Sequence, residues 1–182
     1  NILNLAEIER EIDFFKNFCS PEFYVVQTGS LTKEVNQVGN FNDDFLKSIS
    51  ALLKRKGLKL KEHNADYLSK DDINKRKGIV DAVNIAPQLG VVQTNLVLGK
   101  CLIYGIDFTD FVDEIYNGGK WKKWMHNNTH ENKFLCALIA GHYHFSSDNY
   151  KKIISQLEDV CDIHEEIINA ISGVIEHYEN SQ

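Results

Sequence analysis

Three short runs rich in β-branched and aromatic residues alternate with single helical segments in the first half of the chain, and this order constrains the fold most. The runs are Phe23–Gln27, Leu58–Glu62 and Val80–Ile85. Amphipathic spacing predicts the helices between them, at Asn42–Lys56 and at Lys70–Lys77, where Ser69 is the N-cap. Strands joined by single helices pair in parallel through right-handed crossovers. We therefore expect three parallel strands whose carboxyl ends share one edge.

The remainder of the chain has a helical pattern. We expect a first helix over Asn4–Phe18 and a long apolar helix over Leu89–Tyr104, followed by helices at Phe108–Ile115, Asn132–Gly141, Asn149–Gln156 and Ile163–Glu179. Apolar residues at steps of three and four predict one shared core made of Leu135, Leu138, Ile139, Ile154, Leu157, Ile167, Ile171, Val174 and Ile175. The expected organisation is an α/β region over residues 1–105 with a helical C-terminal extension, residues 106–182, packed on it.

Charge and hydropathy narrow the class of protein. The 182 residues include 20 Lys and Arg and 26 Asp and Glu, so the net charge is -6. This balance argues against a nucleic acid or an anionic membrane as the main partner. No apolar run approaches the roughly 18 residues of a membrane-spanning helix, and we expect a cytoplasmic protein. The four cysteines are scattered, which is typical of reduced, mostly buried thiols.

Candidate functional residues follow each predicted strand, because ligands of parallel α/β folds bind beyond the carboxyl ends of the strands. The polar and small residues at these positions are Thr28, Gly29, Ser30, His63, Asp66, Asn84, Ala86 and Gln88. The turn at Asn84–Pro87 precedes a helix, where backbone N–H groups can bind an anion, although Pro87 supplies none.

His63 and Asp66 lie three residues apart, next to Glu62, and two interpretations stay open. In the first, the imidazole and the carboxylates bind a metal ion or carry a proton. In the second, His63 ends a strand and hydrogen-bonds a neighbouring loop.

The residues around His63 resemble a known family. The segments Lys61–Leu68 (KEHNADYL) and Ala82–Leu89 (AVNIAPQL) resemble tagatose-bisphosphate aldolase subunits of the GatZ/KbaZ type, which carry E-x-H-x-x-D-Y, a short helix and a strand ending in V-G-P. His63, Asp66, Tyr67 and Pro87 match this pattern, and Ala86 replaces the glycine. The run FYVVQT at residues 23–28 is similar to Y-V-I-G-T of the family. The resemblance spans nearly the whole chain, as the C-terminal half of that family.

A wider resemblance is to class II fructose-bisphosphate aldolases, which are zinc-dependent (β/α)8 barrels. It places His63 at the zinc-ligand histidine of L-H-G-G-S-G and Asn84–Ala86 at the phosphate-binding turn K-V-N-V-A-T. Asn64 and Ala65 replace two glycines of the first motif. No histidine occurs between Asn1 and Glu62, where another zinc ligand is expected, so a zinc site with three protein ligands is not visible.

The resemblance implies an α/β fold that is a portion of a (β/α)8 TIM barrel, about three parallel β/α units. A complete barrel needs ~250 residues, so upstream strands are expected from elsewhere in the protein or from another chain. The implied function is a stabilising, non-catalytic subunit of a class II sugar-bisphosphate aldolase in carbohydrate metabolism. It would associate with a catalytic aldolase subunit or with itself, keep a phosphorylated-sugar pocket and need no cofactor of its own.

The alternative is an active, metal-dependent aldolase or epimerase that acts on a phosphorylated ketose. Its divalent metal, zinc, would be bound by His63, and Asp66 would carry the proton.

Overall fold

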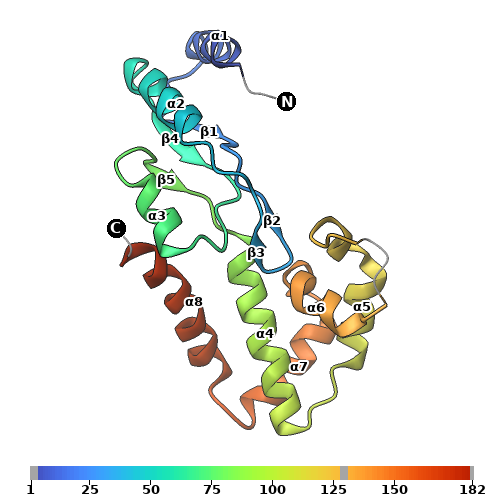
Figure 1. Ribbon diagram of the computed structural model, residues 1–182. Helices are drawn as coiled ribbons and strands as arrows, with labels where there is room; N and C mark the ends of the chain where they lie inside the picture. Colours follow the sequence, from blue (N-terminus) through green and yellow to red (C-terminus); the bar gives the residue numbers. More distant parts are fainter. Residues whose placement is uncertain (1–3, 128–130, 181–182) are drawn as a thin grey trace. The chain divides into compact units, whose positions relative to one another are not determined.

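A three-stranded parallel sheet organises the first half of the chain in the computed structural model, which describes residues 4–127 and 131–180 (Figure 1). The strands are β1 (Phe23–Val26), β4 (Lys59–Glu62) and β5 (Ala82–Val83), in the order β1-β4-β5. Both pairs are parallel, so the predicted parallel arrangement is confirmed. Within the described residues the sheet is open, with β1 and β5 as its edges. The structure is a mixed α/β fold, and its place as a portion of a (β/α)8 barrel stays a prediction.

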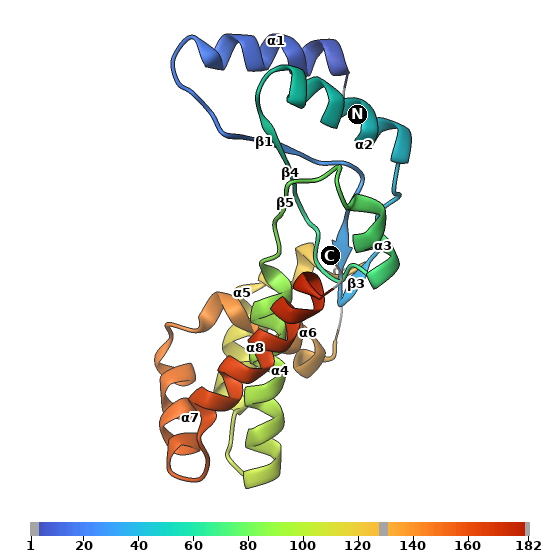
Figure 2. The same ribbon diagram turned by 90° about the vertical axis from the view of Figure 1, so that its left-hand side faces the viewer.

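The two faces of this sheet differ. Alternate residues Tyr24, Val26 and Leu60 pack into an apolar core with residues from α1 (Leu5–Lys16) and α2 (Asp43–Arg55); its buried members are Ile8, Ile12, Val26, Leu46, Ile49, Leu52, Leu53, Leu58 and Leu60. The helix α3 (Lys70–Arg76) lies on the same side as α2 (Figure 2). The other face carries Phe23, Val25, Lys59 and Lys61, of which Phe23 and Val25 are exposed.

Short polar side chains set the starts of the helices. Asn42 accepts a hydrogen bond from the Phe45 N–H at 3.0 Å, and Ser69 accepts one from the Asp72 N–H at 3.1 Å. These bonds satisfy N–H groups that have no partner within the first helical turn. The predicted starts of these two helices, α2 and α3, and the Ser69 cap are therefore confirmed.

A short two-stranded sheet was not expected. It consists of β2 (Thr32–Lys33) and β3 (Asn36–Gln37), in a segment whose composition predicts a polar loop. Glu34 lies at the turn with a positive φ of 54°. Strands of two residues are too short to produce a visible alternation, so the sequence pattern does not reveal them.

The chain divides into two compact units. The sheet unit comprises the residues up to Leu31 and Gln37–Ile85, and the helical unit comprises Thr32–Asn36 and the chain from Ala86 onward. The expected division at residue 105 grouped the helix α4 (Pro87–Tyr104) with the strands, whereas its contacts are with the later helices. The packing of the extension on the sheet region stays a prediction.

The helical unit is built around α4. The elements that follow are α5 (Thr109–Gly118), the 3-10 helix η1 (Lys120–Lys123), α6 (Lys133–Ala140), the 3-10 helix η2 (Gly141–His144), α7 (Asp148–Glu158) and α8 (Ile163–Glu179). Its core contains Leu98, Phe111, Trp121 and Ile139, and Trp121 donates its indole N–H to the Tyr116 carbonyl at 2.9 Å. No helix among residues 4–127 and 131–180 is long and apolar enough to cross a lipid bilayer.

The predicted core of the tail is confirmed in its central part. Ile139 and Leu157 are buried, and Leu135, Leu138, Ile154 and Ile167 pack against the same core. The prediction is wrong for Ile175, which is 41% exposed near the end of α8. Ile168, seven residues before Ile175, is also exposed, whereas Tyr178 is buried, so α8 carries apolar side chains on its outer side and helical spacing alone does not tell which of them are covered.

The cysteines are free thiols, as expected. Cys101 and Cys136 are buried, Cys161 is half-buried and Cys19 is exposed. Burial raises the pKa of Cys101 to about 11 and also raises the pKa of Cys136. A raised pKa keeps both buried thiols protonated and unreactive at neutral pH.

Gly90 in α4 has a packing role that can be tested. A Cβ at Gly90 would lie 2.3 Å from the His142 Cβ, whereas a Cβ at Gly99 in the same helix meets no atom within 4 Å. We expect Gly90→Ala to lower the free energy of unfolding by about 1–3 kcal/mol through overpacking. Gly99→Ala should be neutral or stabilise by up to about 1 kcal/mol, because alanine favours the helix. Urea unfolding measures both, and equal effects would contradict the close packing of α4 against η2.

His142 should make stability depend on pH. Burial, together with the charges of Lys123 and His144, lowers its pKa from 6.5 to about 4. Between these values the unfolded chain binds more protons at His142 than the folded chain, so this contribution to stability is lost as the pH falls through that window. Urea unfolding at pH 7 and pH 5 should show a smaller loss for His142→Gln than for the unchanged chain. His126→Gln, at an exposed position, is the control and should leave the loss unchanged.

Candidate functional site

The carboxyl edge of the sheet brings together residues that are far apart in the sequence. The His63 N–H bonds the Val26 carbonyl at 3.2 Å, and the Asn84 N–H bonds the Glu62 carbonyl at 2.9 Å. These bonds continue the parallel ladders one residue beyond β4 and β5. His63 and Asn84 are therefore neighbours at the same edge, as the strand ends predicted.

A buried ion pair lies directly behind this edge. Glu62 is fully buried, and its carboxylate accepts hydrogen bonds from Arg76 Nε and from Arg76 Nη2, the latter at 3.0 Å. Arg76 Nη1 also donates to the Asp72 carbonyl at 2.8 Å, and its guanidinium stacks over the Phe41 ring at 4.7 Å. A buried carboxylate is tolerated only with such compensation. The pair thus joins the end of β4 to the end of α3.

The residues after β1 form hydrogen bonds with Glu62 and with the backbone of His63. Thr28 is buried and donates its hydroxyl to the Glu62 carboxylate, and the Ser30 hydroxyl donates to the His63 carbonyl at 2.5 Å. Gly29 has a φ of 102°, and a Cβ there would lie 2.1 Å from the Asn40 carbonyl oxygen. Gly29 is thus required for close backbone packing. Thr28, Gly29 and Ser30, which the sequence predicts as ligand-binding residues, thus have a structural role. They hold the residues after β1 against the carboxyl edge of the sheet.

His63 presents an exposed ring at the edge. The Asn84 amide Nδ2 lies 3.1 Å from His63 Nδ1. With the amide as donor, Nδ1 accepts and the neutral ring carries its proton on Nε2. The ring is then oriented as a hydrogen-bond donor, which suits an anionic or hydroxylated ligand.

Asp66 lies in a tightly wound loop. Asp66 is only 1% exposed, and its backbone carbonyl accepts a hydrogen bond from Gln37 Nε2 at 3.0 Å. Asn64 and Tyr67 on either side have positive φ values of 56° and 59°. The structure therefore buries Asp66 within the sheet unit, whereas His63 is exposed.

Ala86 and Gln88 belong to the helical unit. Ala86 precedes α4 without a side-chain cap, and Pro87 occupies the first turn. The Gln88 side chain accepts a hydrogen bond from the Tyr178 hydroxyl at 3.0 Å, which ties α4 to α8. The structure groups these two residues with each other and not with Thr28, Gly29 or Ser30.

The donor set around His63 does not fit a zinc site with three protein ligands. Among residues 4–127 and 131–180, no three His, Cys, Asp or Glu side chains are placed to hold a metal ion. The carboxylate of Glu62 is already bound by Arg76 and Thr28 on the covered face. His63 therefore lacks the neighbouring ligands that zinc needs.

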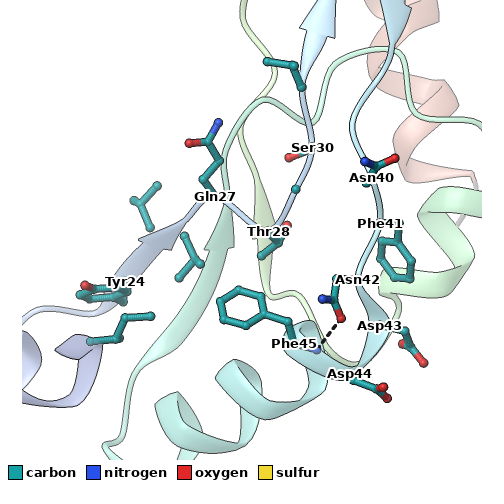
Figure 3. Close-up of a pocket in the computed structure, with 15 residues that line it drawn as sticks. Tyr24, Gln27, Thr28, Ser30, Asn40, Phe41, Asn42, Asp43, Asp44 and Phe45 are labelled. Atoms are coloured by element: carbon teal, nitrogen blue, oxygen red, sulfur yellow. Dashed lines mark hydrogen bonds between the residues drawn. The ribbon is translucent and has the colours of Figure 1, made fainter. Parts of the chain in front are cut away.

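An open cavity of about 1190 Å³ runs along β1 and the start of α2 in the sheet unit (Figure 3). Aromatic rings and small polar side chains line it, among them Tyr24, Thr28, Ser30, Asn40, Phe41, Asn42, Asp43, Asp44 and Phe45. None of its described lining residues is basic. A phosphate would meet two carboxylates here, so the cavity favours a neutral, hydroxylated group.

Three important residues were not singled out from the sequence. The sequence pattern marks Glu62 only as a neighbour of His63 and assigns no role to Arg76. Lys61 was missed altogether, although it lies two residues before His63 on the uncovered face. The alternation along β4 places Lys61 and His63 on the same face of the sheet, so the strand pattern alone indicates that Lys61 lies beside the candidate residues.

Comparison with known proteins gives the fold only. No family model matches the chain, and no curated protein matches it. Among solved structures, it is similar to the crystal structure of a probable tagatose 6 phosphate kinase from Sinorhizobium meliloti 1021, with a TM-score of 0.60 and 13% identity. The match covers 87% of this chain and 52% of the other, so the chain spans about half its length. This likeness supports a partial α/β fold.

The ion pair between Glu62 and Arg76 should contribute strongly to the free energy of unfolding. We expect Arg76→Ala to lower the free energy of unfolding by about 3–5 kcal/mol, because it leaves the Glu62 carboxylate buried without a counter-charge. Urea unfolding measures the change. The control is Lys75→Ala, which removes an exposed pair with Asp72 and should cost at most about 1 kcal/mol. Similar losses in the two variants would contradict the role given to Arg76.

Proposed function

We propose that this chain is part of a protein that binds a phosphorylated ketose and is related to the GatZ/KbaZ-type subunits of class II tagatose-bisphosphate aldolases. The observation that carries the proposal is the shared carboxyl edge, where parallel strands bring His63 and Asn84 together next to Thr28 and Ser30. This is the edge at which parallel α/β folds bind ligands. The matching residues His63, Asp66 and Tyr67 support the same family.

The solved structure with a similar fold supports sugar-phosphate chemistry through its name, a probable tagatose 6 phosphate kinase. The cavity along β1 adds aromatic rings and amide and hydroxyl groups, which suit the carbon chain and hydroxyls of a ketose. Under this proposal, the neutral part of the ligand lies in the cavity and its phosphate lies at the edge.

The proposed role is stabilising rather than catalytic. The class II reaction needs a divalent metal as Lewis acid, and the donor set around His63 does not supply the ligands. The proposed partner is a catalytic aldolase subunit or a second copy of the chain. The open edge of β1 supports this association, because an edge strand has hydrogen-bonding groups available for a further strand.

One observation favours the alternative of an active, metal-dependent aldolase or epimerase. The His63 ring is exposed and its Nδ1 is held by Asn84, as a metal-binding imidazole is often held by a neighbouring hydrogen bond. Partner residues would then have to complete the metal site.

Calorimetry tests the proposal. Tagatose 1,6-bisphosphate should bind the chain, and unphosphorylated tagatose should bind at least tenfold more weakly, because the phosphate interactions are lost. Asn84→Ala should weaken bisphosphate binding about tenfold, as expected for one charge-assisted hydrogen bond. Equal binding of the two sugars, or none of either, would overturn the proposal. Cleavage of the bisphosphate by the chain that requires both zinc and His63 would favour the active enzyme.

A further inference from the structure

We propose that Lys61 binds the phosphate group of the ligand, in an anion site formed with His63 and Asn84 on the uncovered face of the sheet. This inference rests on the proposed function and names the charge on which phosphate binding depends. The site is distinct from the cavity along β1, which has acidic and no basic lining residues in the described part of the chain.

The strand register places these residues on one face. Val25 and Ala82 flank Lys61 in the ladder, and the following row of the same face holds His63 and Asn84. The neighbours Leu60 and Glu62 point to the opposite, helix-covered face, where both are buried. Lys61 is thus directed away from the apolar core and away from the Glu62 carboxylate.

The reach of the lysine fits the site. Residues two apart in a strand are separated by about 6.6 Å, and the four-carbon stem of a lysine spans a comparable length. The ammonium group of Lys61 can therefore reach the level of the His63 ring and the Asn84 amide. The ammonium and the imidazole Nε2–H are then two donors on this face, and Asn84 orients the ring through His63 Nδ1.

The charge of Lys61 is available for a ligand. No acidic side chain of the described residues forms an ion pair with it. By contrast, Lys59, two residues earlier on the same face, pairs with Glu22 at 2.7 Å and lies over the Phe23 ring. The nearby carboxylates are engaged elsewhere: Glu62 binds Arg76, and Asp81 accepts from the Leu60 N–H at 2.8 Å.

Lys61 is a half-buried residue, and no acidic side chain of the described residues forms an ion pair with it. A cation without an acid partner, beside a hydrogen-bond donor at the carboxyl edge of the sheet, is the feature that points to an anion. A phosphate monoester supplies the negative charge and accepts several hydrogen bonds at once.

Lys61 and Lys59 lie two residues apart on the same face of β4, so variants of the two can be compared directly. Inorganic phosphate and tagatose 1,6-bisphosphate are titrated into the chain and into Lys61→Gln, Lys61→Arg and Lys59→Gln, with the shift of the Asn84 side-chain amide followed by NMR. We expect Lys61→Gln to weaken both ligands at least tenfold and Lys61→Arg to retain most of the affinity. Lys59→Gln should change the affinity less than twofold. Unchanged urea midpoints exclude loss of folding, because Lys61 is outside the core.

The outcomes separate this inference from the proposed function. If the bisphosphate binds and Lys61→Gln leaves its affinity unchanged, or if both lysine-to-glutamine variants weaken it equally, the role of Lys61 is wrong while sugar-phosphate binding stands. If phosphate binds through Lys61 and the bisphosphate binds no tighter than phosphate, the anion site stands and the ketose is wrong. If neither ligand binds the unchanged chain, both proposals are overturned.

Discussion

The buried contact between Glu62 and Arg76 is the interaction on which the rest of the sheet unit depends. Glu62 receives hydrogen bonds from Arg76 at the end of α3 and from Thr28 after β1, so one carboxylate joins three segments of the chain. Since the pair lies on the helix-covered face, it also determines which residues of β4 face outward. Lys61 and His63 are directed to the open face because Leu60 and Glu62 occupy the covered one.

The strands and helices of this chain were largely predictable from the sequence. Parallel pairing followed from the alternation of β-rich runs with single helices, and the helix starts followed from Asn42 and Ser69. The hairpin of β2 and β3 was not predictable, because two-residue strands leave no periodic pattern. The expected boundary at residue 105 also differs from the structure, in which the helical unit already begins again at Ala86. The helix α4 is apolar around its circumference, and such a helix gives no indication of which neighbours bury it.

The candidate site was predicted in position but not in its internal chemistry. The strand ends place Thr28, Ser30, His63 and Asn84 at the carboxyl edge, which is a property of topology, and their role in ligand binding stays a prediction. Their hydrogen bonds depend on partners distant in the sequence: Arg76 lies 14 residues from Glu62, and Thr28 lies 34 residues from it. No local motif encodes such pairs. Lys61 escaped notice because a charged residue in an alternating strand normally indicates a solvated face.

Successive residues from Leu60 to His63 face opposite sides of the sheet, so substitutions at neighbouring positions have different consequences. Changes at Leu60 or Glu62 alter the core or the buried ion pair and therefore affect folding. Changes at Lys61 or His63 alter only the charge and hydrogen-bonding character of the open face. A lineage can thus exchange the ligand of this sheet by substituting every second residue while its scaffold remains intact.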